Sequence, residues 1–148
     1  MFPNAKGSEL LSVLATIDPA SQAAGAASTG WVPVANYFGF LALVQTGVLG
    51  TSATVDAKLQ QALDSSGTGV KDISGKAITQ IVKATGDNKQ VLVNVKPEEL
   101  DTVNGFGFVR LTVTVGVAAS ITSAQLLGVN PRYAPADVGN QAAVVQVI

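Results

Sequence analysis

The chain has 148 residues, of which 47% are hydrophobic and only 13% are charged, and its nine basic and ten acidic residues leave a net charge of −1. This length predicts a single domain whose core is large enough to fold without a disulfide or a metal ion. The balanced charge argues against a nucleic-acid-binding protein, which presents a basic surface to the phosphates.

The first predicted element is a strand near the N-terminus. Residues 9–18 alternate between apolar and polar side chains, which indicates a strand or an extended arm. A helix through Leu10, Leu11 and Leu14 is the competing interpretation. Residues 20–30 consist of Ala, Gly, Ser, Thr and Gln only, so we expect a loop there.

No export signal or membrane helix is predicted. Residues 1–6 lack the basic stretch and the following apolar stretch of a signal peptide. No apolar run approaches the ~18 residues of a membrane helix. We therefore expect a soluble protein that is made in the cytoplasm.

The middle of the chain is a series of predicted strands. Residues 31–37 form one that Pro33 confines to a sheet edge, because proline cannot donate a ladder hydrogen bond. The nearly continuous apolar run 38–45 predicts a strand buried on both faces. Residues 54–64 alternate and predict a half-buried antiparallel strand, although Leu59, Ala62 and Leu63 also fit a helix. Shorter strands are expected at residues 70–73, 77–84 and 91–95.

The last third of the chain carries the clearest strand signal. Residues 97–101 predict one helical turn, because proline suits its first position and acidic residues suit its first turn. Residues 108–115 alternate throughout, and residues 120–129 form the last predicted strand. The apolar run 144–148 has no evident partner in the sequence.

Seven or eight strands, spaced by roughly 8–15 residues, predict an all-β fold. We expect a single-domain antiparallel β-sandwich, with the jelly roll as the favoured form. The sequence divides into an N-terminal strand or arm and loop over residues 1–29, a sandwich core over 30–135 and a C-terminal arm over 136–148.

The chain offers few groups for catalysis or metal binding. It contains no His and no Cys, which excludes Ser-His-Asp and Cys-His catalysis and removes the usual zinc and haem ligands. The densest acidic cluster, Glu98, Glu99 and Asp101, lacks the alternating spacing of a calcium loop and is better explained as capping of a helical turn. Gly105 and Gly107 precede a strand, which disfavours a phosphate loop. We therefore expect no catalytic residue, no enzyme activity, no metal and no cofactor.

The low charge content predicts a surface that a partner covers, since soluble monomers usually carry more charge. The alternative is a monomer with a polar surface of Ser, Thr, Asn and Gln. Arg110, on the polar face of the strongest strand, is either solvated or part of an interface. Trp31 and Tyr37 are expected in the core or at its rim, with sugar stacking as the rarer alternative. The candidate interface residues, taken from the terminal segments and this strand, are Leu10, Leu11, Leu14, Arg110, Val144, Val145, Val147 and Ile148.

The order of several short motifs resembles one group of viral proteins. The motifs are GWVPVANY at 30–37, LQQA at 59–62, VNVK at 93–96 with ELD at 99–101, GF at 105–106 before VRLTV at 109–113, and NPRY at 130–133. In this order they resemble small virion proteins of tailed bacteriophages, some of which are similar to jelly-roll capsid decoration, or cement, proteins. The resemblance covers residues 30–135.

This resemblance implies a non-enzymatic structural protein that binds and stabilises the head shell. Its partners are then the major capsid protein and further copies of itself, as a dimer or trimer, with no nucleic acid and no membrane. Its location is the capsid surface of the virion, after synthesis in the host cytoplasm. The alternatives are a neck or tail component and a carbohydrate-binding jelly-roll attachment module. An aromatic content of only 5% favours the structural role, because sugar binders expose aromatic platforms.

The two terminal segments, residues 1–18 and 136–148, are the expected contacts between copies. Laid across a neighbour, such a segment can add a strand to a sheet edge through main-chain hydrogen bonds. The alternative for residues 144–148 is pairing within their own sandwich.

Overall fold

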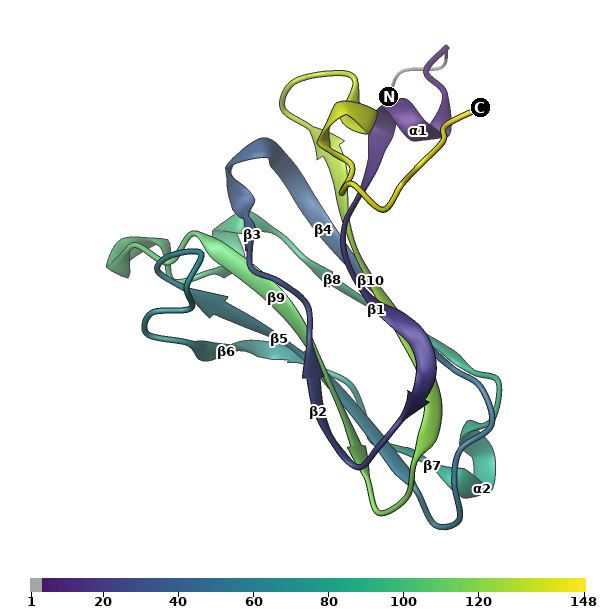
Figure 1. The fold of residues 1–148 in the computed structure, drawn as a ribbon. Coiled ribbons are helices and arrows are strands. Elements are labelled where there is room, and N and C mark those ends of the chain that lie inside the picture. Colours follow the sequence, from purple (N-terminus) through teal and green to yellow (C-terminus); the bar gives the residue numbers. More distant parts are fainter. Residues whose placement is uncertain (1–3) are drawn as a thin grey trace.

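The computed structural model describes residues 4–148, which fold into two antiparallel sheets packed face to face (Figure 1). The strands are, in chain order, β1 (Leu11–Gln22), β2 (Gly25–Ser28), β3 (Val32–Pro33), β4 (Tyr37–Thr46), β5 (Thr54–Ala62), β6 (Lys71–Ala77), β7 (Ile81–Val82), β8 (Gln90–Val95), β9 (Phe108–Gly116) and β10 (Ser120–Pro131). The helical turns of the described residues are α1 (Gly7–Leu10), η1 (Val34–Asn36), α2 (Lys83–Gly86), η2 (Pro97–Glu99), η3 (Thr102–Asn104) and η4 (Ala136–Gly139).

The strand order defines a jelly roll. One sheet has the order β1-β10-β4-β8 and the other has the order β2-β9-β5-β6, with the two-residue strands β3 and β7 attached to β9 and β5. Without β3 and β7, the eight longer strands number 1-8-3-6 in one sheet and 2-7-4-5 in the other. The chain therefore crosses between the sheets at every connection except β5 to β6, which is the double Greek key of a jelly roll. The predicted antiparallel sandwich is confirmed.

The core lies between the two sheets and follows from alternation along the strands. In β9, the side chains of Val109, Leu111 and Val113 are at most 2% exposed, whereas Arg110 and Thr114 face outward. The facing sheet buries its own alternate residues, among them Phe40, Ala42, Val44, Ala124 and Leu126. Each large apolar side chain that is fully buried contributes roughly 1.5–3 kcal/mol, so this layer supplies most of the favourable free energy of folding.

The N-terminal region belongs to the sandwich and is not an arm from residue 11 onward. β1 pairs with β10 over nine residue pairs, from Leu11–Val129 to Gln22–Ser120. Of the two alternatives for residues 1–29, a strand or an arm, the strand is the one observed from residue 11; residues 1–3 lie outside the described residues. Local sequence patterns do not predict this pairing, because the two strands come from opposite ends of the chain.

Three segments have a secondary structure other than the one predicted from the sequence. β2 lies within the predicted loop 20–30, because its small residues pair with β9 at Val115 to Thr112. Of the predicted strand 31–37, only β3 pairs with β9, and η1 follows it. The predicted strand 77–84 is broken into the end of β6, β7 and α2, since Ile81 and Val82 pair with β5 before the chain turns.

The segment after β10 folds back over β1. The hydroxyl group of buried Tyr37 donates to Ser12 Oγ at 2.8 Å, and Ser12 in turn donates to the carbonyl group of Ala136 in η4. Val13 N–H donates to Asn140 Oδ1 at 2.8 Å, and Gln141 N–H donates to the Val13 carbonyl at 2.8 Å. The C-terminal segment is therefore fixed as far as residue 141. Beyond it, residues 142–148 form no strand, so the pairing of 144–148 within their own sandwich is not observed.

We expect Leu111→Asp to unfold the protein, because Leu111 is fully buried in the core. An unpaired buried carboxylate costs several kcal/mol, against a total stability of roughly 5–15 kcal/mol. Ile121→Asp is the matched control, since this strand residue is 46% exposed. In far-UV circular dichroism and thermal unfolding, the control should keep a β-rich spectrum and a cooperative transition that the core variant loses. A cooperative, native-like melt for Leu111→Asp would contradict the assignment of the core.

Candidate interaction surface

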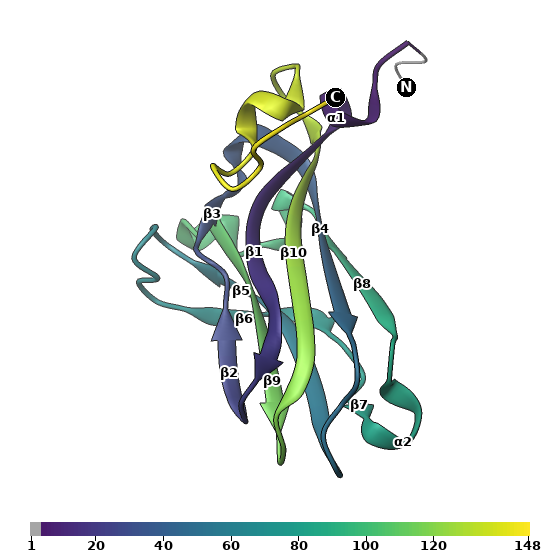
Figure 2. The ribbon, with the colours of Figure 1, turned by 45° about the vertical axis from the view of Figure 1, so that its right-hand side comes forward.

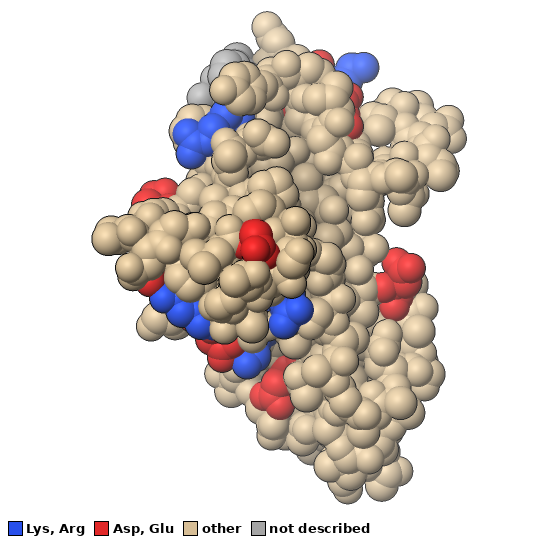
Figure 3. Space-filling model, turned by 60° about the vertical axis from the view of Figure 1, so that its left-hand side comes forward, with Lys and Arg blue, Asp and Glu red and all other residues tan. Residues whose placement is uncertain are grey.

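The two sheets differ sharply in charge. Strands β10, β4 and β8 contain no Lys, Arg, Asp or Glu, and β1 contains only Asp18. The strands of the opposite sheet carry six charged residues, which are Asp56, Lys58, Lys71, Asp72, Lys76 and Arg110. Figure 3 views the side on which β6 lies, where Lys, Arg, Asp and Glu gather in the middle of the molecule. The two outer faces are therefore suited to different surroundings.

The charged face is occupied by its own ion pairs. Lys58 Nζ lies 2.9 Å from Asp72 Oδ2, and Lys76 Nζ lies 2.8 Å from Glu99 Oε1. Lys71 also pairs with Asp101. These partially exposed pairs are typical of a solvated surface.

Arg110 is part of the same network. Its guanidinium group donates to Gln60 Oε1 at 2.9 and 3.0 Å and lies 4.6 Å from the ring centroid of Trp31. Gln60 Nε2 donates in turn to Asp72 Oδ1 at 2.8 Å. The Nε and Nη2 groups of Arg110 therefore have hydrogen-bond partners within the protein, and the guanidinium group covers one face of the Trp31 ring.

Hydrogen bonds lower the pKa of several carboxyl groups on this side. The pKa of Asp72 is lowered mainly by the hydrogen bond from Lys58 and then by the one from Gln60. The pKa of Glu99 is lowered by the hydrogen bond from Lys76 and then by the backbone N–H of Lys96. The charged forms of these groups are therefore stabilised in the folded state.

The outer side of the β1-β10-β4-β8 sheet forms a second, uncharged face. Because strand side chains alternate and the inward set is in the core, the intervening residues point outward. They align across the sheet in rows of paired residues: Leu92, Leu43, Gln125 and Thr16 in one row, and Asn94, Leu41, Leu127 and Val13 in the next, in which Leu127 is already buried by its neighbours. We call these eight residues the uncharged face. It mixes leucine with amide and hydroxyl groups, which is the composition of a surface that another protein can cover without desolvating charge.

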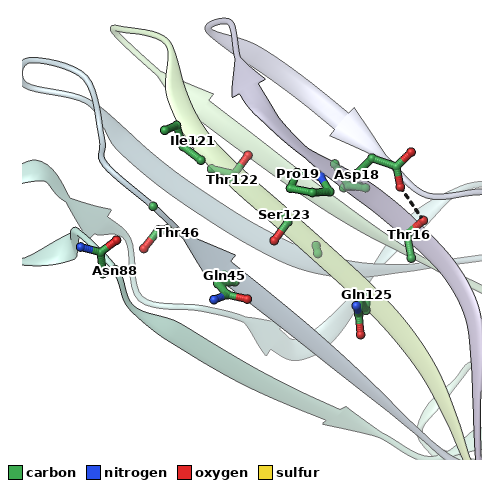
Figure 4. A pocket seen from close by; sticks show the side chains of 13 residues that line it. Thr16, Asp18, Pro19, Gln45, Thr46, Asn88, Ile121, Thr122, Ser123 and Gln125 are labelled. Atoms are coloured by element: carbon green, nitrogen blue, oxygen red, sulfur yellow. Dashed lines mark hydrogen bonds between the residues drawn. The ribbon is translucent and has the colours of Figure 1, made fainter.

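A hollow of about 460 Å³ continues this surface toward the turn after β4. Figure 4 shows Gln45, Ser123 and Gln125 side by side on the neighbouring strands β4 and β10, with Thr16 and Asp18 beyond them on β1. The Asp18 carboxylate accepts a hydrogen bond from Thr16 Oγ1 at 3.0 Å. Hydroxyl, amide and single carboxylate groups can bind a polar surface, but they form no nucleophile and base pair.

The loops at one end of the sandwich extend the uncharged surface. The β4–β5 and β9–β10 connections contain no charged residue and expose Val48 and Val117. Val117 has φ of 70°, a conformation that costs a β-branched residue about 1–2 kcal/mol. An exposed valine held in this conformation adds to the apolar character of this end of the sandwich.

The predicted interface residues lie in the N-terminal segment, the C-terminal segment and strand β9. Leu10 ends α1, while Leu11 and Leu14 lie in β1, where Leu14 packs against the core. Arg110 lies on the charged face, away from the others. Val144, Val145, Val147 and Ile148 are in the C-terminal segment, and Figures 1 and 2 show both termini at the same end of the sandwich. The terminal residues are thus brought together, and Arg110 is not among them.

The sequence-based list omitted the uncharged face. The run 38–45 was expected to be buried on both sides, yet Leu41 and Leu43 are half-exposed because no further layer covers that side of β4. Leu92 is 59% exposed for the same reason. The sequence does show that β4, β8 and β10 carry no charged residue. This observation predicts an uncharged face only once the three strands are known to be neighbours in one sheet.

The aromatic residues are largely engaged within the protein. Tyr37 is 5% exposed and packs edge-to-face on Phe40 with ring centroids 5.8 Å apart. Arg132 lies 4.2 Å from the ring centroid of the exposed Phe38. Among residues 4–148, no group of three Asp or Glu side chains is placed to hold a metal ion. No helix in this same range is long and apolar enough to span a membrane.

No protein-family model and no curated protein sequence matches this chain. The fold is similar to that of several solved structures. The SPBc2 prophage-derived protein YomS is 9% identical, with a TM-score of 0.44 over 79% of this chain and 91% of that chain. The CBM22-2 xylan-binding domain of Paenibacillus barcinonensis Xyn10C is 12% identical, with a TM-score of 0.45 over 86% of this chain and 91% of that chain.

A protein of the Cowpea Mosaic Virus empty virus-like particle is 10% identical, with a TM-score of 0.44 over 88% of this chain and 85% of that chain. The three are a prophage-derived protein, a xylan-binding domain and a component of a virus-like particle. At such identities the similarity is one of fold and says nothing about function. The class that the structure defines is an all-β jelly-roll domain.

We expect the stability of the protein to fall in acid. The ordinary pKa is 3.8 for Asp72 and 4.5 for Glu99, and folding lowers both. A carboxyl group whose pKa is lowered by folding stabilises the folded state at every pH above its ordinary pKa. This stabilisation is lost as the pH falls through the lowered pKa. The free energy of unfolding should be nearly constant from about pH 7 to 5 and should decrease below about pH 4.

The check is urea unfolding across this pH range for the wild type, Asp72→Asn and a control, Glu98→Gln. Asp72→Asn should flatten the acid dependence and cost less than about 1 kcal/mol at neutral pH, because the pair is exposed. Glu98 lies 3.8 Å from its ammonium partner on Lys96, so its removal should leave the profile unchanged. A stability that rises toward pH 3 would contradict the stabilising role of these carboxylates.

Proposed function

We propose that this protein is a non-enzymatic structural component of a tailed-bacteriophage virion, a decoration protein that binds the outside of the head shell and stabilises it. The motif order between residues 30 and 135 supports the viral assignment. The observation that carries the binding role is the uncharged face, which lies opposite a sheet covered with ion pairs. The major capsid protein is the partner that covers this face.

The size of the face suits a repeated contact. Four strands spaced by about 4.8 Å and two outward rows spaced by about 6.8 Å give an area of roughly 260 Å². A stable one-to-one complex buries about 800 Å² on each partner. One copy alone should therefore bind weakly, whereas many copies on a symmetric shell, or an oligomer that presents several faces, can bind firmly. A protein that binds assembled subunits better than free ones shifts the equilibrium toward the shell.

The surface is less suited to sugar binding. An aromatic platform must offer a free ring face, and the guanidinium groups of Arg110 and Arg132 cover one face of Trp31 and one face of Phe38. Tyr133 is 78% exposed, but it lies after β10 and is not part of the uncharged face. The uncharged face itself contains no aromatic side chain. A neck or tail component would use the same kind of surface, so the binding experiment includes tails as well as heads.

Leu43→Lys should weaken binding to the shell without unfolding the protein. Leu43 is half-exposed and lies between Leu92 and Gln125 at the centre of the uncharged face. A lysine there would have to be desolvated on binding, which should lower the affinity at least about tenfold. The matched control is Thr114→Lys, which places the same side chain on the outward side of β9 in the other sheet.

The measurement is co-sedimentation of the wild type and each purified variant with heads that lack this protein and, separately, with tails and with host-surface polysaccharide. Thermal melts show that both variants fold. Equal binding of both lysine variants to heads would exclude the uncharged face as the contact. Binding of the wild type to tails and not to heads would favour the neck or tail role. Binding to host-surface polysaccharide alone would favour the attachment module.

A further inference from the structure

The two sheets have four edge strands, β1, β8, β2 and β6, and three of them are protected against pairing with another chain. β1 has two register shifts, contains Asp18 and Pro19, and is covered near Val13 by residues 140 and 141. β6 carries Lys71 and Asp72 and has a register shift against β5. β2 has only four residues. Charge, proline, irregularity and short length are the devices that keep an edge strand from adding a foreign strand.

β8 has none of these devices, and Figure 2 shows it at the rim of its sheet, beside β4. Its register with β4 is regular from Gln90 to Val95 and includes neither charge nor proline. Thr46 N–H donates to the Lys89 carbonyl at 2.9 Å, so Lys89 directs its carbonyl toward β4. By antiparallel alternation, Gln90, Leu92 and Asn94 direct their N–H and C=O groups away from β4.

These outward groups have no partner within the described part of the chain. No hydrogen bond among residues 4–148 reaches the backbone of Gln90, Leu92 or Asn94 on the side away from β4. Beside them lies a groove of about 500 Å³ between residues 75–79 and 91–94. Val93 and Ile78 pack against the core from this side and remain partly open. A strand placed here would find main-chain partners on β8 and an apolar floor beneath.

The same chain contains a segment of matching chemistry. Residues 142–148, with the sequence AAVVQVI, have no charge, no proline and no glycine, and β-branched residues are favourable in strands. Val145 is 92% exposed and Ile148 is 101% exposed. This segment therefore exposes apolar side chains that a strand position would cover.

The segment cannot pair with β8 of its own sandwich over its whole length. Gln141 is fixed to β1, and a strand added beyond β8 would lie four strand spacings away, about 19 Å. By residue 144 the chain can extend only about 11 Å from residue 141. The segment that fits this edge must therefore come from a second copy.

We propose that residues 143–148 of one copy add as a fifth strand to the β8 edge of a second copy. Main-chain hydrogen bonds to Gln90, Leu92 and Asn94 supply the affinity, and alternate side chains of the segment cover Val93 and Ile78. The contact is head-to-tail, so repetition produces a ring or an open chain of copies. It concerns two copies of the purified protein and does not depend on binding to a shell.

Two variants test the two sides of this contact, one in the β8 edge and one in the C-terminal segment. Leu92→Pro removes an N–H that points away from β4, so an edge strand can tolerate it. Val145→Asp places a charge in the added strand. Val103→Asp is the matched control, because Val103 is 95% exposed in η3, far along the chain from both elements.

Sedimentation velocity over a range of protein concentrations measures self-association, and thermal melts establish folding. The wild type and Val103→Asp should form dimers and larger species. Leu92→Pro and Val145→Asp should each remain monomeric and folded. An equimolar mixture of these two variants should form a dimer and nothing larger, because one variant keeps an intact edge and the other keeps an intact segment.

Other outcomes would overturn the proposal. A monomeric wild type at high concentration would show that the segment does not bind the edge. If Val145→Asp associates as the wild type does while Leu92→Pro does not, two β8 edges pair with each other instead. If Leu92→Pro does not fold, Asn94→Pro replaces it as the edge variant, since the N–H group of Asn94 also points away from β4. Failure of the mixture to form a dimer would exclude the head-to-tail arrangement.

Discussion

The pairing of β1 with β10 is the constraint on which the rest of the structure depends. It joins the first and last long strands over nine residue pairs and closes one sheet of the jelly roll. Because these strands run antiparallel, the start of β1 and the end of β10 meet at one end of the sandwich, as Figures 1 and 2 show. The chain after β10 then lies over β1, where Ser12 links Tyr37 to Ala136 and Val13 holds residues 140 and 141. This arrangement determines where the C-terminal segment leaves the sandwich.

The separation of charge between the sheets is the second organising feature. Ammonium groups on β5 and β6 pair with Asp72 or with Glu99 and Asp101, and the Asp56 carboxylate accepts a hydrogen bond from Gln80, so these groups have partners within the protein. On the other sheet, amide and hydroxyl groups keep the outward side compatible with water. Covering that side desolvates no charge except Asp18 at its margin, so the penalty for burial is small. A protein with evenly mixed charge would have no such preferred side.

The uncharged face and the open edge are adjacent, because β8 contributes to both. Leu92 and Asn94 project outward from the sheet, while the main-chain groups of the same residues point along the sheet plane, away from β4. A strand added to β8 would therefore widen the uncharged face rather than compete with it. Self-association and contact with a larger partner can then occur on one copy at the same time.

The sequence by itself determined the class of fold and the absence of common catalytic groups. The alternation at residues 54–62 and 108–115 located β5 and β9, since an antiparallel strand with one buried side must repeat every second residue. The turn at 97–99 followed from its proline and acids. The jelly-roll form followed from the number and spacing of the strands.

Only the tertiary structure decided which strands are neighbours. β1 has its partner at the other end of the chain, and the small residues of β2 carry no local signal, so neither assignment could come from a window of sequence. The run 38–45 is apolar on both sides, and the sequence could not show that one side faces solvent. The uncharged face and the free edge of β8 arise from strands that are distant in the chain and adjacent in the sheet. Adjacency is set by long-range packing and hydrogen bonding, which local periodicity does not encode.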